Sequence, residues 1–101
     1  ADNGMRPIHV AAYVGSTEAA VAFASAGASV EAWTDQGGMM PMHWAAGQGH
    51  AAVLLALLDA RAGLDAEDGD QRTPLHYAAA RGFVEAVEAL IAARADLEAK
   101  G

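Results

Sequence analysis

The chain has no cysteine, few basic residues and no long apolar run. Of its 101 residues, 6 are Lys or Arg and 13 are Asp or Glu, so the net charge is −7. Without cysteine, disulfides and thiol chemistry are excluded, and we expect an intracellular protein. An acidic chain argues against nucleic acid or an anionic membrane as partner, because both bind Lys and Arg. No apolar run reaches about 18 residues and no signal peptide opens the sequence, so membrane insertion is not expected.

One stretch of the sequence occurs three times. The copies cover residues 6–15 (RPIHVAAYVG), 40–49 (MPMHWAAGQG) and 73–82 (TPLHYAAARG). Each contains proline, an aliphatic residue or Met, histidine, two alanines and a final glycine. The prolines, Pro7, Pro41 and Pro74, lie 34 and 33 residues apart. A period near 33 is typical of helical solenoids.

The repeated stretch has the composition of a short helix with its two ends. Proline suits the first helical turn, where its missing N–H would be unpaired in any case. Thr73 is a good N-cap, whereas Arg6 and Met40 in the other copies are not. The paired alanines let a neighbouring helix approach closely. The final glycine can adopt the left-handed conformation that ends a helix.

The repeated stretch resembles the ankyrin repeat family, whose pattern runs Asp-x-x-Gly-x-Thr-Pro-Leu-His-x-Ala-Ala-x-x-Gly-His, then a second helix and Gly-Ala-Asp. The resemblance covers essentially the whole chain, in repeats of about 1–34, 35–67 and 68–100. It implies an all-α fold, a single domain of residues 1–101. Three helix–turn–helix units would stack in an L-shaped solenoid, joined by hairpin-like loops. Three repeats are about the minimum for a stable stack.

Each repeat should contain two helices. They are predicted over residues 7–14 and 18–26, then 41–48 and 51–59, and finally from Pro74 and over 84–93. The segment 51–59 (AAVLLALLD) is the most apolar and suits a helix sandwiched between neighbours. In the last helix, the apolar side chains should pack mainly back onto the second repeat; they are Val84, Val87, Leu90 and Ile91.

At three positions a residue other than glycine stands where the family pattern has glycine. Arg61 and Arg94 occupy the place of a left-handed glycine after the second helix, and Gln71 replaces a turn glycine. A non-glycine residue in that conformation costs roughly 1 kcal/mol. Residues 94–96 should end the last helix, and residues 97–101 should lead into a further turn. No polar cap follows, so we expect a longer array, a covering partner or self-association at this end.

The histidines suggest either a metal site or structural hydrogen bonds. His9, His43 and His76 fall on equivalent turns of successive repeats, about 10 Å apart. They cannot share one ion, whose bonds to imidazole are about 2.0 Å. The resemblance implies that this histidine bonds neighbouring loops, and His50 is interpreted in the same way.

An acidic run, Asp65, Glu67, Asp68 and Asp70, lies between the second and third repeats. Its spacing does not match a calcium-binding EF-hand loop, so a solvated turn is favoured. It could also attract a basic partner. We find no catalytic combination of residues and no phosphate-binding loop, so no enzyme, metal or cofactor is predicted.

Large apolar residues gather around the second repeat. Met42 is predicted to be core, and Trp44 half-buried. Trp33 and Met39 fall at hairpin tips, where they either anchor a partner or pack on each other. The resemblance implies a binding surface of hairpin tips and first-helix ends, and this surface includes Gly47 and Ala80. The candidate residues are Asp2, Asn3, Met5, Tyr13, Val14, Trp33, Gln36, Met39, Trp44, Gln48, Glu67, Asp70, Arg72 and Arg81.

The resemblance therefore implies a module that recognises another protein or peptide. If the acidic run takes part in binding, the partner is expected to carry a basic segment. Two alternatives belong to other classes. The chain could be a structural segment that spaces or oligomerises a larger protein, or the regulatory module of an enzyme or channel.

Overall fold

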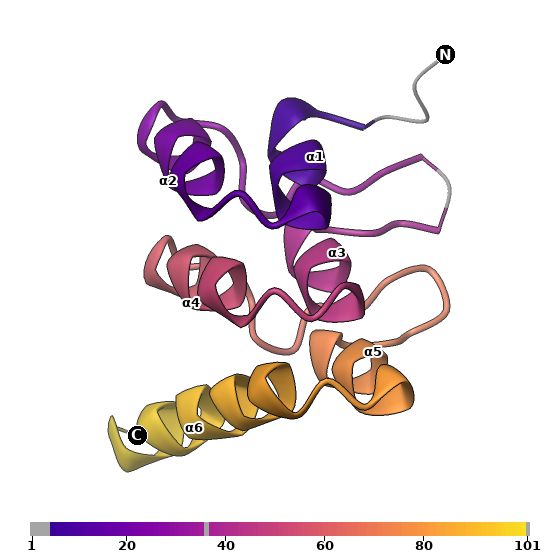
Figure 1. Cartoon of the computed structure of the whole chain (residues 1–101), viewed down its shortest axis with the longest axis vertical. Coiled ribbons are helices and arrows are strands. Elements are labelled where there is room, and N and C mark those ends of the chain that lie inside the picture. The colour runs from indigo at the N-terminus through magenta and orange to yellow at the C-terminus, as the bar shows by residue number, and fades with distance from the viewer. Residues whose placement is uncertain (1–4, 36, 101) are drawn as a thin grey trace.

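The chain folds into six helices arranged as three stacked pairs (Figure 1). The computed structural model describes residues 5–35 and 37–100, with side chains up to Arg94. Within these residues there is no strand, so the predicted all-α class is confirmed. The helices are α1 (Pro7–Val14), α2 (Thr17–Ser25), α3 (Pro41–Gly47), α4 (Ala51–Asp59), α5 (Pro74–Arg81) and α6 (Val84–Lys100).

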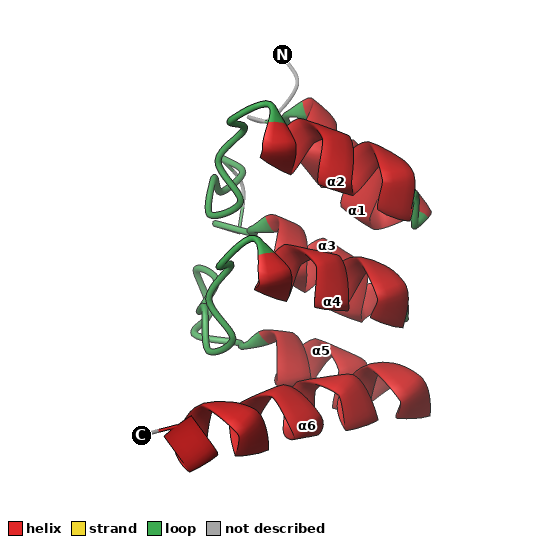
Figure 2. Cartoon of the chain, turned by 90° about the vertical axis from the view of Figure 1, so that its left-hand side faces the viewer, coloured by secondary structure: helices red, strands yellow, loops and turns green. Residues whose placement is uncertain are grey.

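The first helix of each pair stacks on the first helix of the next. Thus α1, α3 and α5 form one column, and α2, α4 and α6 form a second column beside it. The loops between pairs all project from the same side of the stack (Figure 2). The stack measures 40 × 28 × 23 Å. Each pair contacts only its neighbours in the stack, which makes the fold close to one-dimensional.

Most helix bounds agree with the predicted ones, and the differences lie at the ends of α2, α3 and α6. The ranges of α1 and α4 are as predicted. Helix α2 begins and ends one residue earlier, because the Ser16 hydroxyl accepts a hydrogen bond from the Ala19 N–H at 3.2 Å and so caps it. Helix α3 ends at Gly47, one residue before the predicted end. The larger difference is α6, which passes Ala93 and continues to Lys100.

The core is centred on the second pair. Val53, Leu54 and Leu57 of α4 are at most 1% exposed, since α4 lies between α2 and α6, as predicted. Burying each such side chain contributes about 1.5–3 kcal/mol. Met42 of α3 is also a core residue, 1% exposed. Elsewhere alanines make up most of the core, which allows the helices to pack closely.

The last pair packs less completely than expected. Leu90 of α6 is buried and Val87 is half-buried, but Val84 and Ile91 are 65% and 56% exposed. The expectation that all four pack back onto the second repeat is wrong for Val84 and Ile91. Within the described residues, no element packs over these two side chains.

A buried histidine joins each of the first two pairs to the loop that follows it. In α1, His9 Nδ1 accepts a hydrogen bond from the Arg6 N–H at 2.9 Å, and His9 Nε2 donates to the Ala32 carbonyl at 2.7 Å. In α3, His43 Nδ1 accepts from the Met40 N–H at 2.9 Å, and Nε2 lies 2.8 Å from the Ala66 carbonyl. The structural interpretation of these histidines is confirmed.

These bonds require neutral imidazole rings, because Nδ1 must accept while Nε2 donates. Burial lowers the pKa of His9, and the charge of Arg6 lowers it further, although the Ala32 carbonyl acts in the opposite direction. His50 also bridges repeats, since its Nε2 lies 3.0 Å from the Tyr13 carbonyl. In α5, the Thr73 N–H donates to His76 Nδ1 at 2.9 Å, while His76 itself is exposed.

Among the described residues, two that are not glycine adopt the left-handed conformation. Arg61 has φ 73°, as its alignment with a family glycine implied, and Gln71, which replaces a turn glycine, has φ 63°. Gly27, at the position of Arg61 in the first repeat, has φ 95°. The corresponding prediction for Arg94 is wrong, because Arg94 lies inside α6.

Replacing Arg61 by glycine should raise the free energy of unfolding by about 0.5–1 kcal/mol, because glycine tolerates the left-handed conformation without strain. Chemical denaturation of the two proteins measures the difference. Arg94→Gly is the matched control and should lower the free energy of unfolding by about 1 kcal/mol, since Arg94 is helical. An Arg61→Gly variant no more stable than its parent would contradict the assignment of strain.

Candidate interaction surface

Two hairpin loops, described over residues 34–35 and 37–39 in the first and 68–72 in the second, project from the stack next to each other (Figure 2). In the first, the Thr34 N–H donates to the Met39 carbonyl at 2.9 Å. The Met39 N–H donates to the Thr34 hydroxyl at 3.2 Å. In the second, the Asp68 N–H donates to the Arg72 carbonyl at 3.0 Å. Both tips are therefore held by internal hydrogen bonds and form a preorganised surface.

The hairpins are also bonded to each other. The Gly69 N–H donates to the Gly37 carbonyl at 2.7 Å. A Cβ atom at Gly69 would lie 3.1 Å from that carbonyl oxygen, so a side chain there would push the two loops apart. The glycines permit a close contact that makes one continuous strip of the two tips.

Asp68 holds the second hairpin together from inside. It is only 7% exposed, so its inclusion in a solvated acidic turn was wrong. Its Oδ1 accepts hydrogen bonds from the Asp70 and Arg72 N–H groups at 2.8 and 2.9 Å. Its Oδ2 accepts from the Tyr77 hydroxyl of α5. Asp68 thus serves as a structural anchor of the hairpin, and the exposed acidic surface there consists of Asp65, Glu67 and Asp70.

The hydrogen bonds also determine the charge state of Asp68. Burial by itself would raise the pKa of its carboxyl group. The bonds from the Tyr77 hydroxyl and from the backbone N–H groups outweigh burial and bring the pKa below its usual 3.8. Burial, followed by the hydrogen bond to Asp68, raises the pKa of the Tyr77 hydroxyl. The carboxylate is therefore ionised and the phenol is neutral at physiological pH.

Aromatic side chains follow the column of first helices beside the hairpins. The rings of Tyr13 and Trp44 meet edge to face with centroids 5.7 Å apart. Those of His43 and Tyr77 do the same at 5.6 Å. Trp44 is half-buried, as predicted, and its Nε1 is buried without a hydrogen-bond partner among the described residues. Gly47 was expected on the binding surface, but this is wrong because Gly47 is buried and Tyr77 packs against it.

The candidate residues differ in accessibility. Trp33 is 64% exposed beside the first hairpin, whereas Met39 is half-buried. Asp2, Asn3 and Gln36 lie outside the described residues. Of the remaining positions, Tyr13, Val14, Glu67, Asp70, Ala80, Arg72 and Arg81 are exposed, and Met5, Trp44 and Gln48 are half-buried. Arg72 forms a solvent-exposed ion pair with Asp70 at 3.7 Å, which contributes little stability.

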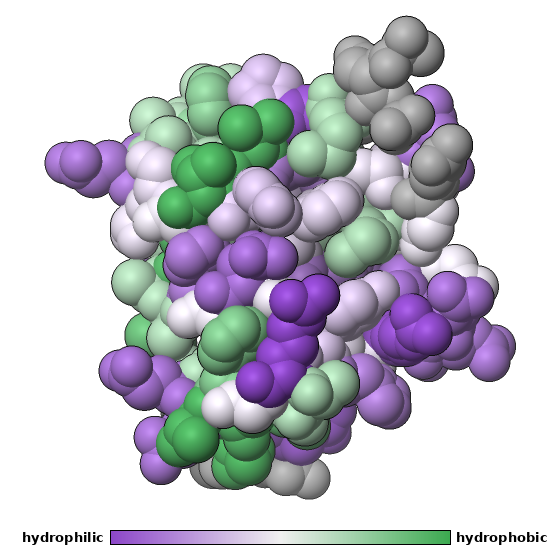
Figure 3. All heavy atoms as spheres, turned by 45° about the vertical axis from the view of Figure 1, so that its right-hand side comes forward, coloured by the Kyte–Doolittle hydropathy of each residue, from purple (hydrophilic) through white to green (hydrophobic). Residues whose placement is uncertain are grey.

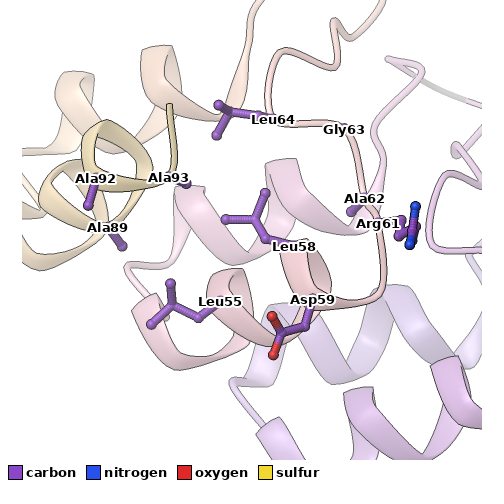
Figure 4. A pocket seen from close by; sticks show the side chains of 10 residues that line it. All are labelled: Leu55, Leu58, Asp59, Arg61, Ala62, Gly63, Leu64, Ala89, Ala92 and Ala93. Carbon is purple, nitrogen blue, oxygen red and sulfur yellow. The ribbon is translucent and has the colours of Figure 1, made fainter. Parts of the chain in front are cut away.

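A concave region that was not foreseen from the sequence lies on the column formed by α2, α4 and α6. Leu55 and Leu58 of α4 face small side chains of α6, and the loop after α4 closes one side (Figure 4). The lining residues are Leu55, Leu58, Asp59, Arg61, Ala62, Gly63, Leu64, Ala89, Ala92 and Ala93. Arg94 of α6 bonds Asp65 of that loop. The pairing of α4 with α6 forms this groove, and no local motif marks it.

No site for a metal ion is evident in the described part of the chain, because no three His, Asp or Glu side chains gather there. None of the helices in residues 5–35 and 37–100 is long and apolar enough to cross a membrane.

Stacked helical pairs with hairpins on one side define the class of helical repeat proteins. Within that class, the family described as ankyrin repeats, in three copies, matches residues 8–101. The chain belongs to the ankyrin repeat family. Ankyrin repeats are generally modules for protein–protein interaction and are typically non-catalytic. A comparison with curated proteins finds no match.

Replacing Asp68 by asparagine should lower the free energy of unfolding at pH 7 by about 1–3 kcal/mol, because an amide cannot accept all three hydrogen bonds. The folded-state pKa is below 3.8, so the wild type keeps this stabilisation above that pH and loses it as pH falls through the folded value. The variant should lose less stability in acid. Denaturation curves at pH 7 and pH 3 test both statements.

Asp70→Asn provides the matched control, because the Asp70 side chain is 68% exposed. It should leave both curves nearly unchanged. Equal effects of the two substitutions would mean that Asp68 has no special role in the hairpin.

Proposed function

We propose that this protein recognises another protein or peptide through its hairpin tips and the ends of its first helices. The observation that carries the proposal is Trp33, an aromatic side chain 64% exposed next to a hairpin that is fixed by hydrogen bonds. Trp offers a large apolar area with a polar N–H group, and it is enriched among the residues that dominate binding energy. Tyr13 and Val14, 47% and 61% exposed, add apolar area at the end of α1.

Rigidity supports the same surface. The hairpins are bonded internally and to each other, and the buried histidines fix the loops to the helices below. A partner would therefore meet a surface that loses little conformational entropy on binding. The half-buried Met39 is an adaptable neighbour, because its unbranched side chain can fill irregular gaps.

Charge favours a basic segment in the partner. Glu67 and Asp70 are exposed at the second hairpin, and the whole chain carries −7. Such charges mainly accelerate encounter with an oppositely charged partner. Asp68 is not available for this role, since its carboxylate is already bonded inside the hairpin.

Trp33→Ala should weaken binding by about 2 kcal/mol or more without affecting the fold, because the lost ring is a central apolar anchor. The probe is a peptide selected on the wild-type chain from a random display library, with affinity measured by calorimetry. Leu55→Ala is the control, since Leu55 is 52% exposed but lies in the α4–α6 groove. If Leu55→Ala abolished peptide binding and Trp33→Ala left it unchanged, recognition would take place in the α4–α6 groove instead.

Neutralising Glu67 and Asp70 together, as Glu67→Gln and Asp70→Asn, should slow association with a basic peptide at low salt and leave dissociation nearly unchanged. Screening should abolish the difference at high salt. Surface plasmon resonance at two ionic strengths measures both rates. A change confined to the dissociation rate would show that these carboxylates make direct contacts and do not steer.

A further inference from the structure

The main chain next to the exposed Trp33 is tied to α1 by a hydrogen bond. His9 Nε2 donates to the Ala32 carbonyl at 2.7 Å, and Ala32 directly precedes Trp33. On the other side of Trp33, Thr34 is bonded to Met39 within the first hairpin. The Trp33 side chain is 64% exposed, so packing does little to fix its direction. The bond from His9 therefore helps to fix where the ring projects.

That bond requires a neutral ring in a buried place. His9 is fully buried, and its Nδ1 accepts a hydrogen bond from the Arg6 N–H at 2.9 Å. A proton on Nδ1 would remove the acceptor and bring two N–H groups face to face. It would also leave a charge in the core, which is costly without a partner of opposite charge. A protonated His9 therefore cannot keep its position.

The charges around His9 do not favour the protonated ring. Helix α1 packs against α2 and α3. The titratable and charged groups that the structure describes on these elements and their loops are Arg6, Tyr13, Glu18, Glu31, Asp35, His43 and His50. Burial lowers the pKa of His9 and the charge of Arg6 lowers it further, against the opposing effect of the Ala32 carbonyl. None of the described carboxylates is thus placed to stabilise a charge on this ring.

The equivalent histidine in α3 holds the second hairpin more firmly. His43 Nδ1 accepts from the Met40 N–H at 2.9 Å. Its Nε2 lies 2.8 Å from the Ala66 carbonyl and 3.1 Å from the Arg72 carbonyl. The ring therefore contacts the chain both before and after the tip of the second hairpin, whereas His9 Nε2 bonds only the Ala32 side of the first among the described residues.

The two histidines also differ in the charge that they face. Burial raises the pKa of the Asp68 carboxyl group, its hydrogen bonds lower it, and a positive charge on His43 lowers it further. The attraction is mutual, so a proton on His43 would face the Asp68 carboxylate. A proton on His9 would face the cation of Arg6. The first hairpin is therefore the more sensitive of the two to acid.

We propose that protonation of His9 is an acid-sensitive switch that releases the chain around Trp33 and weakens partner binding at the first hairpin. It rests on the proposed function, because it is a regulation of the same surface. Once the ring is charged, the Ala32 carbonyl loses its donor and the Arg6 N–H loses its acceptor. The freed segment must be ordered again when a partner binds, and that cost in entropy reduces affinity.

The direction of the pKa change gives the pH window. The ordinary value for His9 is 6.5 in the unfolded chain, and the folded value is lower. The stability contributed by the neutral ring is complete above pH 6.5 and decreases as pH falls from 6.5 through the folded value. Below the folded value, affinity for a partner that needs the fixed Trp33 should fall by up to about tenfold per pH unit, because one proton must be released.

Surface carboxylates titrate in acid as well, and the experiment must separate their effect. Hydrophilic side chains gather on the side of the stack where the hairpins project (Figure 3). Glu67 and Asp70 are exposed there, and their loss of charge would weaken attraction to a basic peptide. A probe peptide without ionisable side chains avoids this contribution. At about 0.5 M salt the Debye length is about 4 Å, which screens the remaining surface charge.

Calorimetry with such a peptide, selected on the wild-type chain and lost in Trp33→Ala, tests the switch. Between about pH 7.5 and about pH 5, the wild type should lose affinity at least about threefold. His9→Gln should lose less than about 1.5-fold, because a neutral amide can accept and donate in place of the two ring nitrogens. His43→Gln is the matched control and should show the loss of the wild type. Unchanged wild-type affinity at the lower pH would overturn the proposal.

Nuclear magnetic resonance of the free wild-type chain tests the release without any variant or peptide. The His9 ring signals and the amide shifts of Ala32 and Trp33 should change together with one midpoint below pH 6.5, while the amide of Ala66 changes less. Circular dichroism should show that the helices persist. Constant shifts at Ala32 and Trp33 while His9 takes up its proton would refute the switch. Peptides that all bind Trp33→Ala normally would contradict the proposed function instead, and this titration would still decide the release.

Discussion

The stack depends on a buried neutral histidine that bonds in two directions. In α1 and α3 the ring caps the start of its own helix through Nδ1 and bonds a carbonyl of the following loop through Nε2. A buried ring with both nitrogens bonded has one orientation and one tautomer. The loop is thereby fixed relative to the helix, and the next pair is held in place. The exposed surface formed by the hairpins derives its rigidity from this interaction.

The two hairpins achieve rigidity by different chemistry. At the second hairpin, the hydroxyl of Tyr77 reaches the buried carboxylate of Asp68. In the preceding repeat, Asp35 is exposed and the ring at the position of Tyr77 is Trp44, whose Nε1 has no partner among the described residues. The first hairpin relies instead on Thr34, which bonds Met39 through backbone and hydroxyl. The equivalent carboxylate is thus an internal anchor in one hairpin and a surface charge in the other.

A linear stack necessarily ends in two unlike faces. Interior pairs bury both faces, and the terminal pairs leave one each, with Val10 at one end and Leu75 at the other. The hairpin tips run along a third side, so end contacts and tip contacts do not compete for the same surface.

The sequence by itself determined most of the fold. Proline, histidine, alanine pair and glycine at a period near 33, with the apolar segments that follow, predicted four of the six helices to within about one residue at each end, and the first residues of α5 and α6. The left-handed backbone at Arg61 followed from its alignment with a family glycine, because that conformation is set largely by local sterics. The exposure of Trp33 was likewise predictable from its place beside a hairpin.

Tertiary structure decided the features that depend on a neighbour. Arg61 and Arg94 occupy equivalent positions, but only the first lies in a loop, because only there does packing outweigh helix propensity. The acidic run looked uniform in sequence, yet Asp68 is buried, since Tyr77 comes within reach only when the pairs stack. The groove between α4 and α6 likewise exists only through stacking. Local sequence specifies what a segment can form, and contacts between repeats select which form is stable.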